Sequence, residues 1–134
     1  MNYGTVVNCI DGTIRLAVIE FLKFAWKVQW IVVISEAAPE KVLSEHKDTQ
    51  TIEHIHNNIR ASLFNQSKKR LAVVSHYGCD INKSGEFEKK DMLRKAVDYL
   101  KSKYPGVEVM GIWVGKEGKP MNFEHTIAGE KSMQ

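Results

Sequence analysis

The chain has 134 residues, a length that favours one domain with a substantial core. Its 43% hydrophobic and 26% charged residues are typical of a globular protein and exclude an intrinsically disordered chain. The net charge of +3 is too small to indicate nucleic-acid binding, and no apolar run approaches the roughly 20 residues that a membrane-spanning helix needs.

The first residues, Met1 to Gly4, lack the charged and apolar regions of a secretory signal peptide. We therefore expect a cytoplasmic protein without a membrane or nucleic-acid partner. In a reducing compartment, a pair of cysteines is more often metal-binding or catalytic than disulfide-bonded. This expectation applies to Cys9 and Cys79, which are the two cysteines of the chain.

The first half of the chain alternates between strand and helix patterns. Residues 3–9 are a short β-branched run that predicts a strand, and apolar residues at every fourth position predict a helix over 14–27. The nearly continuous apolar run over 29–35 indicates a strand that is covered on both faces. Pro39 suits the first turn of a short helix over 39–45.

The same alternation continues to residue 114. Asp48 or Thr49 can cap a helix whose apolar face recurs at helical spacing. A strand is predicted over 70–75, a helix over 86–104 and a further strand over 107–114.

Strands that alternate with helices predict an α/β fold, with a doubly wound, mainly parallel sheet and helices on both faces. With four strands, the natural order is 2-1-3-4. We expect one domain over residues 1–134, in which residues 119–134 form either an extra edge strand or a frayed tail. The first and third strands would be neighbours, and such sheets bind ligands at the carboxyl ends of these strands.

Two short motifs follow these two strands. Cys9-Ile10-Asp11 follows the first, and His76-Tyr77-Gly78-Cys79 follows the third. Thiolate, imidazole and carboxylate groups are zinc ligands, and a site built from Cys9, His76 and Cys79 would leave one position for water, as in catalytic sites.

A simpler interpretation remains open. The two cysteines would be small buried apolar residues, and His76 would be a hydrogen-bonded loop residue. The remaining histidines are interpreted as surface residues, and they are His46, His54, His56 and His125.

The motifs resemble those of the β-class carbonic anhydrases, which are Cys-x-Asp-x-Arg and His-x-x-Cys. The resemblance extends to residues 31–38 and 107–114, which are similar to that family's second and fourth strands. It covers roughly residues 3–118.

The resemblance implies one zinc ion per chain, with Cys9, His76 and Cys79 as its ligands. It implies that Asp11 is catalytic and orients a zinc-bound hydroxide. The implied activity is that of a zinc lyase, a carbonate dehydratase, which reversibly hydrates carbon dioxide to bicarbonate. Similar small linear molecules, such as carbonyl sulfide or carbon disulfide, remain alternative substrates. The resemblance also implies a homodimer.

One residue departs from the family pattern. Thr13 stands where the family has an Arg that pairs with the Asp and holds it off the metal. Without that Arg, Asp11 could bind zinc as a fourth ligand, which would impair catalysis. The alternative function is therefore a non-catalytic zinc-binding protein, whose site is closed by Asp11 beside the two cysteines and the histidine. Arg15 is a candidate to replace the missing Arg.

A different enzyme class also fits part of the sequence. Cys9 and Arg15 are spaced as in Cys-x5-Arg phosphatases, where a helix N-terminus holds the phosphate. Asp11 lies inside that loop and would repel a phosphate, and the pattern leaves the His-x-x-Cys motif unexplained.

Overall fold

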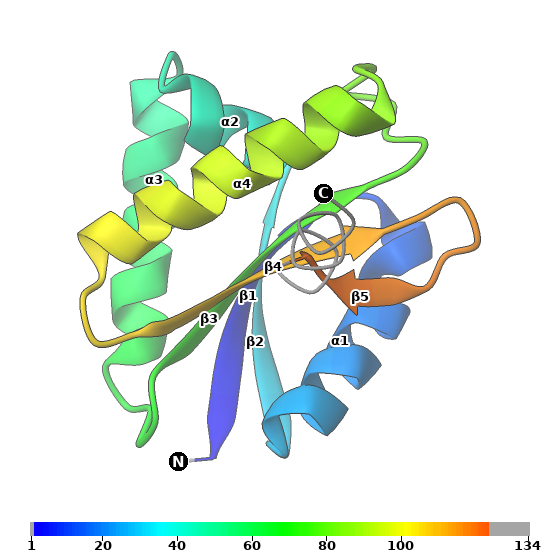
Figure 1. Cartoon of the computed structure of the whole chain (residues 1–134). Coiled ribbons are helices and arrows are strands. Elements are labelled where there is room, and N and C mark those ends of the chain that lie inside the picture. Colours follow the sequence, from blue (N-terminus) through cyan, green and yellow to red (C-terminus); the bar gives the residue numbers. More distant parts are fainter. Residues whose placement is uncertain (1, 124–134) are drawn as a thin grey trace, which may run out of the picture.

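A computed structural model describes residues 2–123 of the chain (Figure 1). His125 and the rest of residues 124–134, for which a frayed tail was one expectation, lie outside this part. The elements, in chain order, are β1 (Tyr3–Cys9), α1 (Gly12–Trp26), β2 (Trp30–Glu36), α2 (Pro39–Glu45), α3 (Thr49–Leu63), β3 (Arg70–His76), α4 (Glu86–Lys103), β4 (Glu108–Val114) and β5 (Pro120–Asn122).

The strands form a single sheet in the order β2-β1-β3-β4-β5. The first four are mutually parallel, and β5 pairs antiparallel with β4. The predicted α/β fold and the order 2-1-3-4 are therefore confirmed. The extra edge strand is present over Pro120–Asn122, where it extends the sheet beyond β4.

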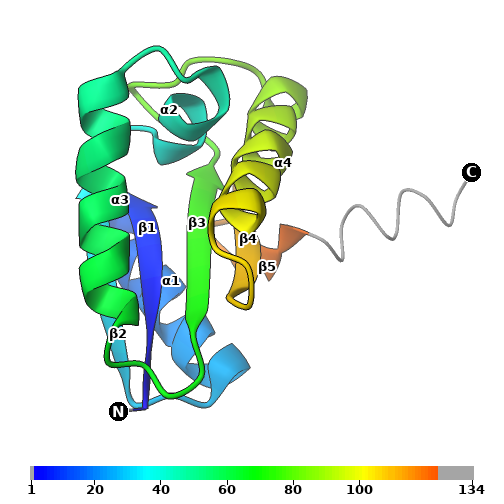
Figure 2. The same cartoon turned by 90° about the vertical axis from the view of Figure 1, so that its left-hand side faces the viewer.

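Helices cover both faces of the sheet, as a doubly wound fold requires. One buried cluster joins Val7 and Val73 to apolar residues of α2, α3 and α4. The other joins Val6, Ala72 and Val74 to residues of α1. Figure 2 shows the same division, with α3 and α4 on the near side of β1 and β3 and with α1 behind them. Alternate residues of the central strands thus face two separate cores.

The ends of the helices follow local capping interactions. The Asp11 side chain accepts a hydrogen bond from the Thr13 backbone N–H, so α1 begins at Gly12 rather than at residue 14. The helix ends before Lys27, whose φ of 53° is left-handed. Asp48, one of the two predicted caps, begins α3 in the same way through Thr51.

The central pair of strands positions the two motifs. β1 and β3 are paired in parallel from Thr5–Leu71 to Val7–Val73. Their carboxyl ends therefore leave the sheet side by side, and their last residues are Cys9 and His76. From β1 the chain passes to β2 on one side of this central pair, and from β3 it passes to β4 on the other side. This is the reversal point at which open α/β sheets bind ligands.

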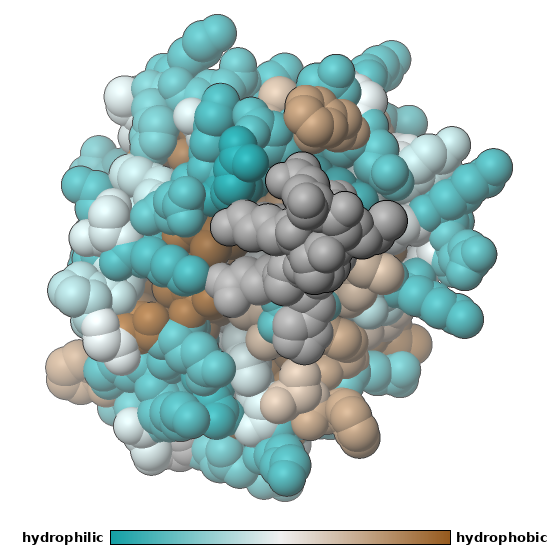
Figure 3. Space-filling view, viewed as in Figure 1, coloured by the Kyte–Doolittle hydropathy of each residue, from teal (hydrophilic) through white to brown (hydrophobic). Residues whose placement is uncertain are grey.

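The surface over α4 is mostly hydrophilic, and apolar side chains show below it in the view of Figure 3. None of the helices within residues 2–123 combines the length and the apolar character that crossing a bilayer would require.

A substitution at Gly111 would test how closely α4 packs on the sheet. A Cβ added to Gly111 would lie 2.8 Å from Val97 Cγ2 and 3.4 Å from Leu93 Cγ, and both residues belong to α4. Overpacking of a close-packed core costs about 1–3 kcal/mol, so we expect G111A to lower the free energy of unfolding by that amount. Gly12→Ala is the matched control, because its added Cβ meets nothing within 4 Å. Urea denaturation measures both variants, and equal stability of the two would contradict this packing.

Candidate metal centre

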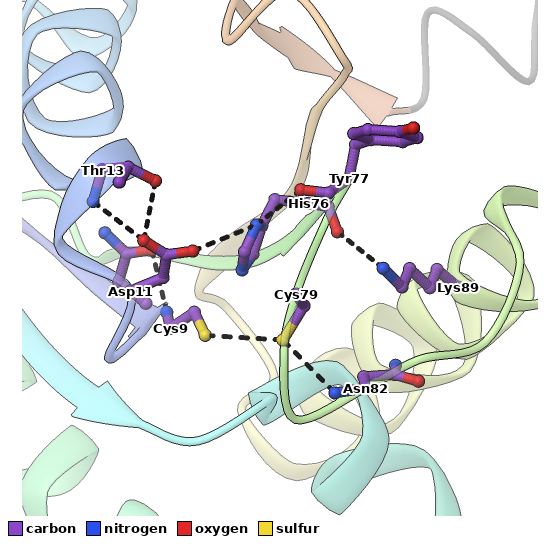
Figure 4. Close-up of polar contacts among 9 residues, drawn as sticks. Cys9, Asp11, Thr13, His76, Tyr77, Cys79, Asn82 and Lys89 are labelled. Atoms are coloured by element: carbon purple, nitrogen blue, oxygen red, sulfur yellow. Dashed lines mark hydrogen bonds and ion pairs between the residues drawn. The ribbon is translucent and has the colours of Figure 1, made fainter.

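Three side chains gather where β1 and β3 end (Figure 4). One donor atom each from Cys9, His76 and Cys79 lies within 4.8 Å of the other two, and all three residues are buried. Cys9 is the last residue of β1 and His76 is the last residue of β3. Cys79 lies three positions further along, and the turn between it and His76 contains Gly78 with a φ of 74°. Glycine adopts this left-handed conformation without a steric penalty.

The two sulfurs have the separation that a shared metal ion would need. Cys9 Sγ and Cys79 Sγ lie 3.9 Å apart, and both cysteines are free. A disulfide would bring the sulfurs to about 2.05 Å. Two thiolates bound to one zinc at about 2.3 Å, at a tetrahedral angle, lie about 3.8 Å apart. The donor pair therefore fits a tetrahedral zinc ion.

The hydrogen bonding of the His76 imidazole also suits a bound metal ion. Its Nδ1 lies 3.0 Å from the Tyr77 carbonyl oxygen, which can only accept, so Nδ1 carries the proton. The other nitrogen, Nε2, is buried and lacks a hydrogen-bond partner within the described residues. Buried polar atoms are rarely left unpaired, and a deprotonated ring nitrogen is a metal ligand. The unpaired Nε2 is thus consistent with a bound ion.

Asp11 lies beside the three donors and is held by its own helix. Its Oδ1 accepts hydrogen bonds from the Thr13 backbone N–H at 2.9 Å and from Thr13 Oγ1 at 2.7 Å. Its Oδ2 lies 4.0 Å from His76 Nδ1. The bonds from Thr13 and, to a smaller extent, the charge of His76 lower the pKa of Asp11, although partial burial opposes them. Asp11 is therefore an ionised carboxylate at neutral pH, and its role as a ligand or catalytic group stays a prediction.

Arg15 does not make the contact expected of a replacement for the family Arg. Its guanidinium donates a hydrogen bond to Ser35 Oγ, on β2, whereas Asp11 is bound by Thr13. The same arrangement weakens the phosphatase hypothesis, because the Asp11 carboxylate occupies the N-terminus of α1. A phosphate at that position would meet a negative charge.

A buried polar network supports the turn that carries Cys79. The Asn82 backbone N–H donates to Cys79 Sγ at 3.3 Å. The Asn82 side-chain amide donates to Glu40 Oε1 at 2.8 Å. Glu40 is fully buried, and burial raises its pKa, although the bond from Asn82 and the charges of His76 and Lys89 oppose that shift.

Lys89 of α4 contacts the other end of the same turn, at His76. Its side chain is buried, and its ammonium donates to the His76 carbonyl oxygen at 3.1 Å. It also lines a cavity of about 260 Å³ that reaches Cys79, Tyr77 and Trp113. The cavity meets the cluster at Cys79, and neither Cys9 nor His76 lines it.

The supporting residues Glu40, Asn82 and Lys89 were not identified from the sequence. Glu and Lys are almost always exposed, and Asn82 lies in a stretch with the composition of a surface loop. A pattern of residue types gives no signal that these side chains are buried, because their burial depends on how α2 and α4 pack over the sheet.

Comparison with known proteins agrees with this geometry. Residues 1–124 match the family described as "Putative carbonic anhydrase", a match that includes all five strands and both motifs. A search of curated proteins finds no match. Since the family match covers most of its 134 residues, the chain belongs to this carbonic anhydrase family.

Proposed function

We propose that the protein binds one zinc ion through Cys9, His76 and Cys79 and reversibly hydrates carbon dioxide to bicarbonate. The observation that carries this proposal is the buried cluster of two free thiols and one unpaired imidazole nitrogen. Membership of the carbonic anhydrase family supports it. A site with three protein ligands retains an open position, which is characteristic of catalytic zinc sites.

Zinc bound at such a site lowers the pKa of a water ligand to about 7 and so supplies a nucleophile at neutral pH. The chain's own groups would orient the reactants. Asp11 Oδ1 is occupied by Thr13, which leaves Oδ2 to accept a hydrogen bond from the attacking water. The cavity beside Cys79 would admit carbon dioxide or a similar small linear molecule.

Thr13 takes over the anchoring role that the resemblance assigns to an Arg. Two hydrogen bonds from Thr13 hold Asp11 Oδ1 in place, and they favour a site in which Asp11 is not a fourth ligand. The closed, non-catalytic site, in which Asp11 joins the two cysteines and the histidine on the metal, is the alternative. In the closed site Asp11 would bind through Oδ2, the oxygen that Thr13 does not hold, and it would have to move, because Asp11 is not among the residues whose donor atoms lie within 4.8 Å of one another.

The zinc ligands are tested by His76→Ala. Because the substitution removes one of three donors, we expect zinc affinity to fall by more than about 100-fold, beyond the loss typical of outer-shell changes. Elemental analysis of the purified protein should give about one zinc per native chain and nearly none for the variant. His54→Ala is the matched control, because that side chain is 67% exposed. Full zinc occupancy in H76A would refute the assignment.

The role of Thr13 is tested by a pair of substitutions. Thr13→Val removes the hydroxyl that donates to Asp11 and keeps the branched shape, whereas Thr13→Ser keeps the hydroxyl. We expect stopped-flow carbon dioxide hydration to slow by about tenfold in T13V, the equivalent of one lost hydrogen bond, and to stay within about twofold in T13S. Zinc-loaded native protein that shows no hydration, together with a gain on Thr13→Arg, would instead establish the closed site.

We also propose that the protein is a cytoplasmic homodimer. A reducing compartment would keep the two thiols free for metal, and the family resemblance implies the dimer. β2 lies at the edge of the sheet, and its Trp30 and Val32 are 59% and 37% exposed. Phe24 is also exposed, whereas Trp26 is buried in the core. Unpaired apolar edge strands are surfaces on which a second chain can pair.

Val32→Lys tests the edge strand as the dimer interface. A charged side chain on the edge opposes pairing, so sedimentation equilibrium should change from the mass of two 15.3-kDa chains to that of one. Phe87→Lys is the control, because Phe87 is exposed on α4. A native protein that sediments as a monomer would contradict the proposal.

A further inference from the structure

A second polar pocket lies between α3 and α4, and it shares no residue with the metal centre. It has a volume of about 250 Å³ and is lined by His56, Arg60, Tyr99, Lys103 and Tyr104. The first two residues belong to α3, the next two to α4, and Tyr104 directly follows α4. In Figure 1, the yellow end of α4 approaches α3 at this place. The proposed function uses none of these five side chains.

His56 lies at the centre of the pocket, half-buried between two phenols, which a simple surface residue would not be. Its Nδ1 lies 2.5 Å from the Tyr104 hydroxyl, and its Nε2 lies 2.8 Å from the Tyr99 hydroxyl. A neutral imidazole has one N–H and one acceptor nitrogen. One tyrosine hydroxyl therefore donates a hydrogen bond to the ring, and the other accepts a hydrogen bond from the ring N–H. The second tyrosine keeps its own O–H available to donate to a ligand.

The electrostatic surroundings of the pocket are positive. Burial lowers the pKa of His56, and the charges of Arg60, Lys103 and His46 lower it further. Burial is also the main reason that the pKa of Tyr99 and that of Tyr104 are raised, so both phenols stay protonated.

Within the described part of the chain, the two permanent cations of the pocket form no ion pair with a carboxylate. Arg60 donates to the Asn57 side-chain oxygen at 2.5 Å, and the Lys103 ammonium lies 5.7 Å from the centre of the Tyr99 ring. The ion pairs found within residues 2–123 include neither residue. Two cations and a phenol donor thus line one cavity.

We propose that this pocket binds the phosphate group of a small molecule. A phosphate carries close to two negative charges and several acceptor oxygens, which complement the Arg60 and Lys103 side chains and the tyrosine hydroxyls. A bicarbonate ion has one negative charge and would gain less from the same cations. The proposal is independent of the activity at the metal centre.

A bound dianion would also change the protonation of His56. It offsets the positive charges of Arg60 and Lys103 and so favours the imidazolium form. In that form both ring nitrogens donate to the tyrosine oxygens, and both phenolic O–H groups become free to donate to the ligand. The His56 ring thus couples ligand charge to the number of donors in the pocket.

Calorimetric titration of the zinc-loaded full-length protein with inorganic phosphate, at constant ionic strength, tests the proposal. We expect saturable binding with Kd of about 1 mM or tighter. Arg60→Gln and Lys103→Gln should each weaken it by about tenfold or more, since each removes a charge-assisted contact. Lys95→Gln is the control, with the same charge change on α4, because Lys95 pairs with Asp91 outside the pocket.

The other outcomes overturn the proposal. Absence of saturable binding would refute the site. Binding that R60Q and K103Q leave unchanged would place phosphate elsewhere, for example at the zinc ion. Bicarbonate that binds as tightly as phosphate, with the same losses in the variants, would overturn the ligand class. A ¹⁵N NMR spectrum of the His56 ring provides a second readout, and both nitrogens should shift to their protonated positions as phosphate is added.

Discussion

The adjacency of the β1 and β3 carboxyl ends is the constraint on which the metal centre depends. Cys9 and Cys79 are 70 positions apart in the chain, yet their sulfurs lie 3.9 Å apart because parallel pairing brings both strand ends to one edge of the sheet. The direction of winding reverses at this point, so the edge is not covered by a crossover helix. Any slip in the pairing of β1 with β3 would separate the three donors and abolish the cluster.

Asp11 shows how one side chain serves both the fold and the site. As the N-cap of α1, it satisfies the Thr13 backbone N–H, which would otherwise lack a partner. The same bonds fix the direction of its second oxygen, beside His76. Accurate placement of a carboxylate near a metal usually needs an outer partner, and here the start of a helix provides it. A threonine hydroxyl is a smaller and uncharged partner than a guanidinium, so it anchors the carboxylate without adding positive charge to the site.

The turn that carries two of the candidate metal donors, His76 and Cys79, is held by buried polar groups. Glu40 of α2 binds Asn82, whose backbone N–H contacts Cys79 Sγ, and Lys89 of α4 binds the carbonyl of His76. Both contacts hold the turn that joins His76 to Cys79 and so restrict it to one geometry, because polar groups in a protein interior are costly to leave unpaired. The second pocket lies between α3 and α4, which cover the same face of the sheet as α2.

The alternation of strands and helices, the order 2-1-3-4 and the meeting of Cys9, His76 and Cys79 could be predicted from the amino-acid sequence. These features depend on local periodicity, on the handedness of crossovers and on two short motifs, all of which can be recognised from residue types. That Arg15 contacts Ser35 and that Glu40 is buried became clear only from the folded chain. Side-chain direction and burial depend on how helices pack across the sheet, and residues distant in sequence set that packing, so no local pattern records it.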